Sequence, residues 1–240
     1  MYRILHLSDI HFNIDKKKHY FDSMTESLIK DLSTLNKSKQ IDFILITGDL
    51  IDKGGLGYDN INSAFQAFET EFINPITESI ALDKSRVLFV PGNHDIDRKT
   101  IKHFSEVGIA NLLINDKSVN DAIINDDSDL TIRIKSFKDF EREYRNKYPS
   151  KKDAITNFQS THIFDDGCNK IGFACINSSW RCSGSENEKI IIGSNQVLAS
   201  IQDLQECSHK ILLSHYSEDS LQDFENTSFQ ERILNEFDIA

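Results

Sequence analysis

The sequence predicts a single α/β domain in which helices cover a sheet of parallel strands. Apolar runs of strand length occupy residues 2–7, 41–47 and 87–90, and stretches with helical periodicity lie between them. Strands that alternate with helices pair in parallel, because right-handed crossovers return the chain to the same side of the sheet. The 240 residues, 39% of them hydrophobic, suffice for one sizeable core. We therefore expect residues 1–240 to form one domain.

Two helices are expected between these strands. Residues 19–36 place Leu28 and Leu32 among polar residues at helical spacing, which predicts an amphipathic helix. Residues 61–76 repeat apolar side chains at intervals of three and four. Pro75 is expected to kink or end that second helix, because it lacks a backbone N–H.

The second half of the chain predicts another set of strands. Residues 161–164 and 171–177 flank a short polar turn, as in a hairpin that leads into a core strand. Residues 196–204 are expected to form a helix, 211–214 a strand and 229–237 a further helix.

Residues 101–160 interrupt this pattern. From residue 101 to about residue 149 the stretch is polar around residues 125–129, helical in period from 137 to 148, and without a clear strand. We expect it to be an insertion over the sheet edge, serving as a lid.

Composition limits the function classes. The net charge of −11 argues against a surface that binds nucleic acid by phosphate neutralisation alone. A phosphate substrate stays compatible, because divalent cations in a carboxylate-rich site reverse the local charge. No apolar stretch reaches the roughly 18 residues of a membrane span, and no secretory leader is evident. The default expectation is a cytoplasmic protein without membrane association.

Polar motifs follow four of the predicted strands. Asp9 and His11 follow the first, Asp49 the second, Asn93 the third and His215 a later one. Carboxylate, amide and imidazole ligands together suit Mn, Fe, Zn or Mg rather than thiophilic metals. Two such ions about 3.5–4 Å apart would hold a phosphoryl group, polarise its oxygens and deprotonate a bridging water.

His94 and Asp95 directly follow Asn93 and suggest proton transfer. We expect His94 to donate a proton to the departing oxygen, or to stabilise charge on the phosphoryl oxygens. Asp95 would hold the imidazole in orientation. A single Asp-x-His or Gly-Asp pair usually means a turn, whereas four such motifs in order at strand ends are seldom a coincidence.

The strings LSDIHF, ITGDLIDKGG, VPGNHD and LLSHYS resemble the successive signature blocks of the calcineurin-like metallophosphoesterases, in order from residue 1 to about residue 217. The resemblance implies a four-layer α/β/β/α sandwich of two mixed sheets flanked by helices, and a site with two divalent ions, Mn²⁺ first, with Fe, Zn and Mg as alternatives. His94 would be the catalytic histidine near the leaving group. By motif position the ligands would be Asp9 and His11 for one ion, Asn93 and His215 for the other, and Asp49 as the bridge.

One block of the family is missing. The pattern ends with Gly-His-x-His after the next strand, and no such string occurs here. Either the chain is the amino-terminal portion of a longer protein, or the site is incomplete and inactive. We favour the first, because residues 238–240 resemble the opening of the strand that should carry the block. Further C-terminal domains or subunits are the expected partners.

Four residues are candidates for substrate contact. Lys17, within a lysine run, would guide a phosphodiester, although such runs are usually solvated loops. Trp180 and Arg181 follow a predicted strand and would stack on or pair with a base or phosphate. An indole packed beneath a loop is an equal alternative. Tyr216 would line the pocket or simply pack.

The leading hypothesis is a metal-dependent phosphoesterase that hydrolyses a phosphodiester, either nucleic acid or a nucleotide, by attack of a metal-bridging hydroxide. The first alternative is a protein or small-molecule phosphomonoesterase, and a protein phosphatase would need an open groove. The second is an inactive fold that serves as an interaction or effector module of a larger defence or signalling protein. Resemblance to a family with many substrates does not choose among these.

Overall fold

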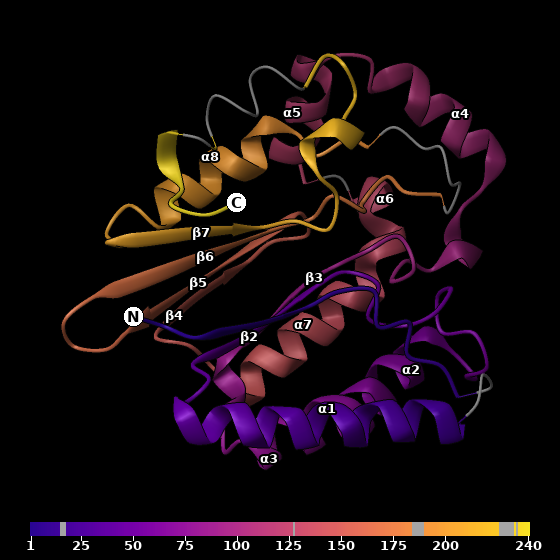
Figure 1. Ribbon diagram of the computed structural model, residues 1–240. Coiled ribbons are helices and arrows are strands. Elements are labelled where there is room, and N and C mark those ends of the chain that lie inside the picture. Colours follow the sequence, from indigo (N-terminus) through magenta and orange to yellow (C-terminus); the bar gives the residue numbers. More distant parts are fainter. Residues whose placement is uncertain (15–17, 127, 184–189, 226–232, 234) are drawn as a thin grey trace.

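The computed structural model describes residues 1–14, 18–126, 128–183, 190–225, 233 and 235–240. Two sheets stack face to face, and helices cover the outer side of each (Figure 1). The predicted α/β/β/α arrangement is confirmed.

The first sheet consists of β1 (Ile4–Leu7), β2 (Phe43–Thr47) and β3 (Val87–Val90). Both pairings are parallel, so this sheet is not mixed as expected. The reason is that every connection between its strands is a long crossover, which parallel pairing requires. The carboxyl ends of all three strands therefore meet at one edge.

The first connections are helical. The structure places α1 at Lys18–Ser38, α2 at Ile61–Phe68 and α3 at Asn74–Ser79. A π-helical stretch, Glu69–Ile73, joins α2 to α3. Pro75 lies in the first turn of α3, and the helical path continues beyond it to Ser79. Of the two outcomes expected at Pro75, an end does not occur, because helical residues lie on both sides of it, and a kink stays a prediction.

The second sheet has the order β4-β5-β6-β7. Its strands are β4 (Lys152–Ile155), β5 (Gln159–Asp165), β6 (Lys170–Ile176) and β7 (His209–Leu213). The predicted hairpin is the antiparallel β5–β6 pair, and β7 runs parallel to β6. Helix α8 (Ser194–Asp203) makes the crossover between β6 and β7. Ile239 forms an isolated parallel bridge with Ile211, which extends the pairing beside β7.

Side-chain alternation along β2 builds the core on both faces of the first sheet. Phe43 and Leu45 pack towards the second sheet, and the Phe43 ring lies 5.0 Å from that of Phe164 and 4.9 Å from that of Phe173. Ile44 and Ile46 belong to the cluster beneath the helices. The two sheets are thus held together by aromatic contacts.

The predicted insertion at 101–160 has two different parts. It contains α4 (His103–Leu112), α5 (Asp116–Ile124), α6 (Ser128–Thr131) and α7 (Lys135–Lys147). Helix α7 is part of the core, since Phe140 stacks on Phe65 with ring centroids 5.0 Å apart. Among the described residues no strand lies between 101 and 149, as expected, whereas β4 and the start of β5 fall in the remainder, residues 150–160. In contrast, α4 buries no residue, and the role of this part as a lid stays a prediction.

Short 3₁₀ helices complete the structure at Lys84–Arg86, Arg98–Thr100, Ile132–Ile134 and Glu218–Ser220. Of the helix predicted at 229–237, residues 233, 235 and 236 are helical, and the others except 237 lie outside the described residues. Within the described part of the chain, no helix combines the length and apolarity needed to span a bilayer.

Candidate metal centre and active site

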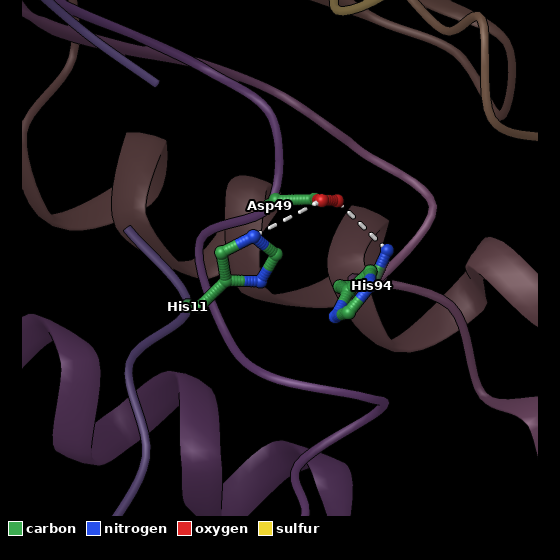
Figure 2. A group of neighbouring side chains, drawn as sticks. All are labelled: His11, Asp49 and His94. Atoms are coloured by element: carbon green, nitrogen blue, oxygen red, sulfur yellow. Dashed lines mark hydrogen bonds and ion pairs between the residues drawn. The ribbon is translucent and has the colours of Figure 1, made fainter. Parts of the chain in front are cut away.

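Loops from both sheets converge on Asp49, the residue that follows the turn at the end of β2. Asp49 is buried, and only 3% of its surface is exposed. His11 Nε2 lies 3.7 Å from Asp49 Oδ2, and His215 Nε2 lies 3.8 Å from Asp49 Oδ1. Asp9 Oδ1 lies 3.9 Å from His11 Nε2. Figure 2 shows His11 and His94 on either side of Asp49, each from its own loop.

The ligand atoms form two overlapping groups that share Asp49. His11, Asp49 and His94 make one group, and Asp9, Asp49 and His215 make the other, with all ligand atoms of a group within 4.8 Å of one another. Gaps near 4 Å are too long for hydrogen bonds and leave room for a cation between the ligands. A shared carboxylate is the arrangement that a bridging ligand requires.

Asn93 tests whether this donor set suits a cation. With its amide nitrogen turned towards Asp49, it donates to both carboxylate oxygens at 3.3 Å and to Tyr216 Oη at 3.2 Å. With the amide oxygen turned there instead, acceptor atoms of Asn93 and Asp49 face each other. A cation between them would stabilise that second orientation. The amide therefore fits the site both with and without a metal ion.

The loops that carry these ligands have an unusual backbone. Asp9, His11 and Asp49 have φ angles of 55°, 51° and 52°, in the left-handed region that residues other than glycine seldom adopt. Backbone hydrogen bonds hold them there: Asp9 N–H donates to Gly48 O at 3.1 Å, and His11 N–H to Asp49 O at 2.9 Å. Such strain persists where the surroundings impose it, and it gathers at functional sites.

Two glycines permit the close approach of ligand side chains. A Cβ atom on Gly92 would lie 2.1 Å from Asp49 Oδ1, and one on Gly48 would lie 2.2 Å from His215 Nδ1. Neither position has space for a methyl group. The sequence pairs Gly48-Asp49 and Gly92-Asn93 thus have a steric basis.

His94 is held by the turn that follows β2. Lys53 N–H donates to His94 Nδ1 at 3.1 Å, and Gly54 N–H donates to His94 O at 2.8 Å. Asp52 Oδ1 also lies 3.1 Å from Nδ1. In the neutral ring Nδ1 accepts from Lys53, and in the protonated ring it donates to Asp52. Burial lowers the pKa of His94 below its ordinary value, although the charge of Asp49 opposes this.

Asp95 does not have the role expected for it. Its carboxylate is fully buried and accepts backbone N–H bonds from Leu50, Ile51 and Gly92 at 3.1, 3.0 and 2.8 Å. Burial, with the nearby charge of Asp49, raises the pKa of Asp95 to about 8. Asp95 therefore fastens two ligand loops to each other, and Asp52 is the carboxylate that contacts His94. Sequence reasoning missed Asp52, although it stands within the quoted string ITGDLIDKGG.

Of the predicted substrate contacts that the structure describes, Tyr216 lies at the site, whereas Trp180 and Arg181 are engaged within the protein. Trp180 is fully buried, its Nε1–H donates to Ile192 O at 3.3 Å, and its ring packs against Phe158. Stacking on a substrate was the wrong expectation, because no face of the indole reaches solvent. Arg181 donates to Glu106 at 2.6 Å and is nearly buried. Tyr216 lies at the site beside His215, with ring centroids 4.8 Å apart. Lys17 lies outside the described residues.

Other histidines whose side chains are described lie away from this cluster or are engaged elsewhere. His162 is buried against Asp153, and His209 faces Asp238 near the end of the chain. His6 bonds to Thr47 Oγ1 at 2.6 Å. Within the described residues, none of these supplies the histidine pair of the missing Gly-His-x-His block.

Comparisons with known proteins agree with this geometry. The model of the calcineurin-like phosphoesterase family matches residues 2–219. One relative is the uncharacterized metallophosphoesterase-like protein YydB of Bacillus subtilis (strain 168), 34% identical over 98 residues. That alignment covers 40% of this chain and only 18% of the relative. The family match spans most of the chain and all the loops that meet at Asp49, and the chain therefore belongs to the calcineurin-like phosphoesterase family.

Proposed function

We propose that this chain hydrolyses a phosphodiester, in nucleic acid or a nucleotide, with the help of two divalent metal ions. The observation that carries the proposal is the convergence of imidazole and carboxylate groups on Asp49 at spacings that leave room for cations. Membership of a phosphoesterase family supports hydrolysis of phosphate esters. The choice of a diester and of Mn²⁺ is part of the proposal.

Five residues would hold the ions: Asp9, His11, Asn93 and His215, with Asp49 between the two. When bound, such ions polarise phosphoryl oxygens and lower the pKa of water. Asp49 is placed to be shared because its two carboxylate oxygens face different histidines. The buried Asp95 keeps the Asp49 and Asn93 loops in register through three backbone N–H bonds.

His94 would donate the proton that the departing oxygen takes up. Its ring packs edge to face on that of His11, with centroids 4.4 Å apart, so it borders the place where the phosphoryl group would lie. Asp52 supports the protonated ring through Nδ1, which leaves Nε2–H for the substrate. This combination makes His94 the general acid and Asp52 its positioning carboxylate.

The second candidate is an inactive fold that serves as an interaction module, an alternative that the absence of a Gly-His-x-His string from residues 1–240 leaves open. One assay distinguishes the phosphodiesterase from the interaction module. Hydrolysis of bis(p-nitrophenyl) phosphate is measured with and without Mn²⁺, together with the metal content of the purified chain. The phosphodiesterase proposal predicts bound metal and Mn²⁺-dependent hydrolysis. Absence of both would leave the interaction module.

The division between ligands and general acid has its own test. His94→Ala should lose activity while Mn²⁺ binding stays within a few-fold of the wild type, because five other residues supply ligands. His162→Ala, at a buried histidine remote from Asp49, is the control for loss of an imidazole. Loss of metal from the His94 variant would make His94 a ligand, as its place beside His11 and Asp49 also permits.

A further inference from the structure

Arg98 differs from every other arginine in the described part of the chain, because its side chain forms no hydrogen bond or ion pair with a described residue. Arg133 and Arg181 share Glu106, and Arg145 donates to the carbonyls of Ser85 and Val87. The remaining partnered arginines are Arg3, Arg86 and Arg142. A half-buried guanidinium with neither a carboxylate nor a carbonyl partner among the described residues is unexpected in a chain with a net charge of −11.

The backbone of Arg98 packs on the turn that holds His94. A Cβ atom on Gly54 would lie 2.8 Å from Ile96 O and 3.9 Å from Arg98 N. The same Gly54 donates its N–H to His94 O. Asp97 fixes the start of the 3₁₀ turn, since its carboxylate accepts from Lys99 N–H at 3.0 Å and its own N–H donates to Arg133 O at 2.7 Å. Arg98 therefore has a defined position next to His94.

The side chain of Arg98 is half-buried, and its Nε atom is buried without a hydrogen-bond partner. A buried donor without a partner is costly and needs an explanation. Burial is the main cause of the lowered pKa of His94, and the positive charge of Arg98 adds to it, which agrees with their proximity. An anion bound at this place would supply the missing partner.

We propose that Arg98 binds a second phosphate of the substrate, beyond the scissile one on the side of the leaving group. The scissile phosphoryl group would lie against Asp49, and the departing oxygen would face His94. A group attached to that oxygen would then lie near Arg98, whose backbone packs on the same turn as that of His94. The planar guanidinium group binds two phosphate oxygens at once, and a cation without a partner among the described side chains attracts anions.

This inference rests on the proposed phosphodiesterase function and narrows its substrate class. The preferred substrate is a phosphodiester whose leaving group itself carries a phosphate, as in an oligonucleotide. A simple diester with an uncharged leaving group should be hydrolysed without help from Arg98.

The test compares two dithymidine substrates, one with a single internal phosphate and one that also carries phosphates at both ends. Arg98→Ala should lower kcat/KM about 10- to 100-fold on the second substrate, because a hydrogen bond to a charged group contributes about that factor. The kcat/KM for the first substrate should stay unchanged. Arg98→Lys keeps the positive charge without the planar guanidinium group and should recover only part of the lost kcat/KM. Lys99→Ala, which removes an exposed charge from the same turn, is the matched control and should match the wild type on both.

Equal losses on the two substrates, or a loss on neither, would overturn the assignment. Thermal unfolding of each variant shows whether the turn still folds. If the wild-type chain cleaves neither substrate, the proposed function fails, and pyrophosphate binding in the presence of Mn²⁺ decides the inference separately. Calorimetry should then show weaker binding of pyrophosphate to Arg98→Ala and unchanged binding of orthophosphate. Equal pyrophosphate affinity in the wild type and the variant would refute it.

Discussion

In the described part of the chain, two clusters of histidine and carboxylate side chains differ in geometry, and one of the two has the properties of a metal site. The cluster at Asp49 has gaps of 3.7–3.9 Å between its ionisable atoms. The second cluster joins α7 to β4 and β5 and contains two direct ion pairs: Lys138 Nζ lies 2.6 Å from Glu141 Oε2, and His162 Nδ1 lies 2.6 Å from Asp153 Oδ1. The gap of 3.9 Å between His162 Nε2 and Glu141 Oε1 joins these two pairs. The 2.6 Å contacts within the pairs leave no room for an ion.

Charge separates the clusters as clearly as distance. Lys138, Glu141 and His162 are each 1–2% exposed, and each carboxylate has a basic partner. Burial raises the pKa of Glu141, but Lys138 and His162 outweigh it and lower the value to about 2. At Asp49, the described partners of the carboxylates are histidines, and none of the described residues places a lysine or arginine against them. Residue types alone therefore do not identify a metal site; spacing and missing counter-charge do.

The largest expected effect is the loss of the shared ligand. Asp49→Asn removes the carboxylate on which both groups depend, and hydrolysis of bis(p-nitrophenyl) phosphate should fall by more than about 100-fold, beyond the loss typical of outer residues. Asp153→Asn makes the same change in the buried cluster and should leave the specific activity of folded protein near the wild-type value. Equal activity in the two variants would remove the distinction between the clusters.

The buried cluster should instead control stability. Glu141→Gln leaves Lys138 buried without a counter-charge, which should lower the free energy of unfolding by about 3–5 kcal/mol in urea titrations. The double variant Lys138→Met/Glu141→Leu should recover most of that loss, since an apolar pair needs no counter-charge. If the single variant unfolds at the wild-type urea concentration, the network adds nothing to stability.

The same pair predicts a pH dependence. The pKa of Glu141 is about 2 in the folded chain against an ordinary 4.5, so the unfolded chain binds the proton first as pH falls. Its stabilising contribution is present above pH 4.5 and is lost as pH falls towards 2. The stability difference between the wild type and Glu141→Gln should shrink over that interval, and a difference that grew there would contradict the assignment.

A glycine pair tests the crowding around Asp49. Gly92→Ala would place a methyl group against the Asp49 carboxylate, and overpacking of this kind costs about 1–3 kcal/mol. Mn²⁺ affinity should fall with it, because Asp49 must move. Gly108→Ala, where no atom lies within 4 Å of the added Cβ, should leave Mn²⁺ affinity unchanged and stabilise α4 slightly. Similar Mn²⁺ affinities for both variants would show that the Asp49 loop adapts.

The smallest effect is expected at the residue that supports His94. Asp52→Asn should lower kcat about tenfold, the lower end of the range for residues that orient an active side chain, with Mn²⁺ affinity nearly unchanged. The loss should be greatest at low pH, where His94 is protonated and needs the negative charge. An unchanged kcat across pH would leave Asp52 with a packing role only.

The sequence predicted where the metal ligands meet better than it predicted the contacts that hold them in place. Parallel strands with long crossovers must end at one edge, so Asp9, Asp49 and Asn93 were expected to meet there. The roles of Asp52 and Asp95 could not be separated in the same way. Both follow a ligand motif closely, and only the folded loops show that Asp95 turns inward to three N–H groups while Asp52 reaches His94.

Two further differences have physical causes of their own. The strand β4 is short and begins with Lys152 and Asp153, so neither alternation nor an apolar run marks it. Trp180 stands at a strand end, as a substrate contact would, but its indole fills the cluster that also holds Phe158 and Val119. Burial by residues far apart in sequence is a tertiary effect that local pattern does not contain.

Equilibrium binding of Mn²⁺ to the wild type, Asp49→Asn and Asp153→Asn tests the central claim most directly. We expect the wild type and Asp153→Asn to bind Mn²⁺ with the same stoichiometry and similar affinity, and Asp49→Asn to lose at least one ion. Undiminished binding by Asp49→Asn, or loss of the ions from folded Asp153→Asn, would contradict the assignment of the metal site to the loops around Asp49.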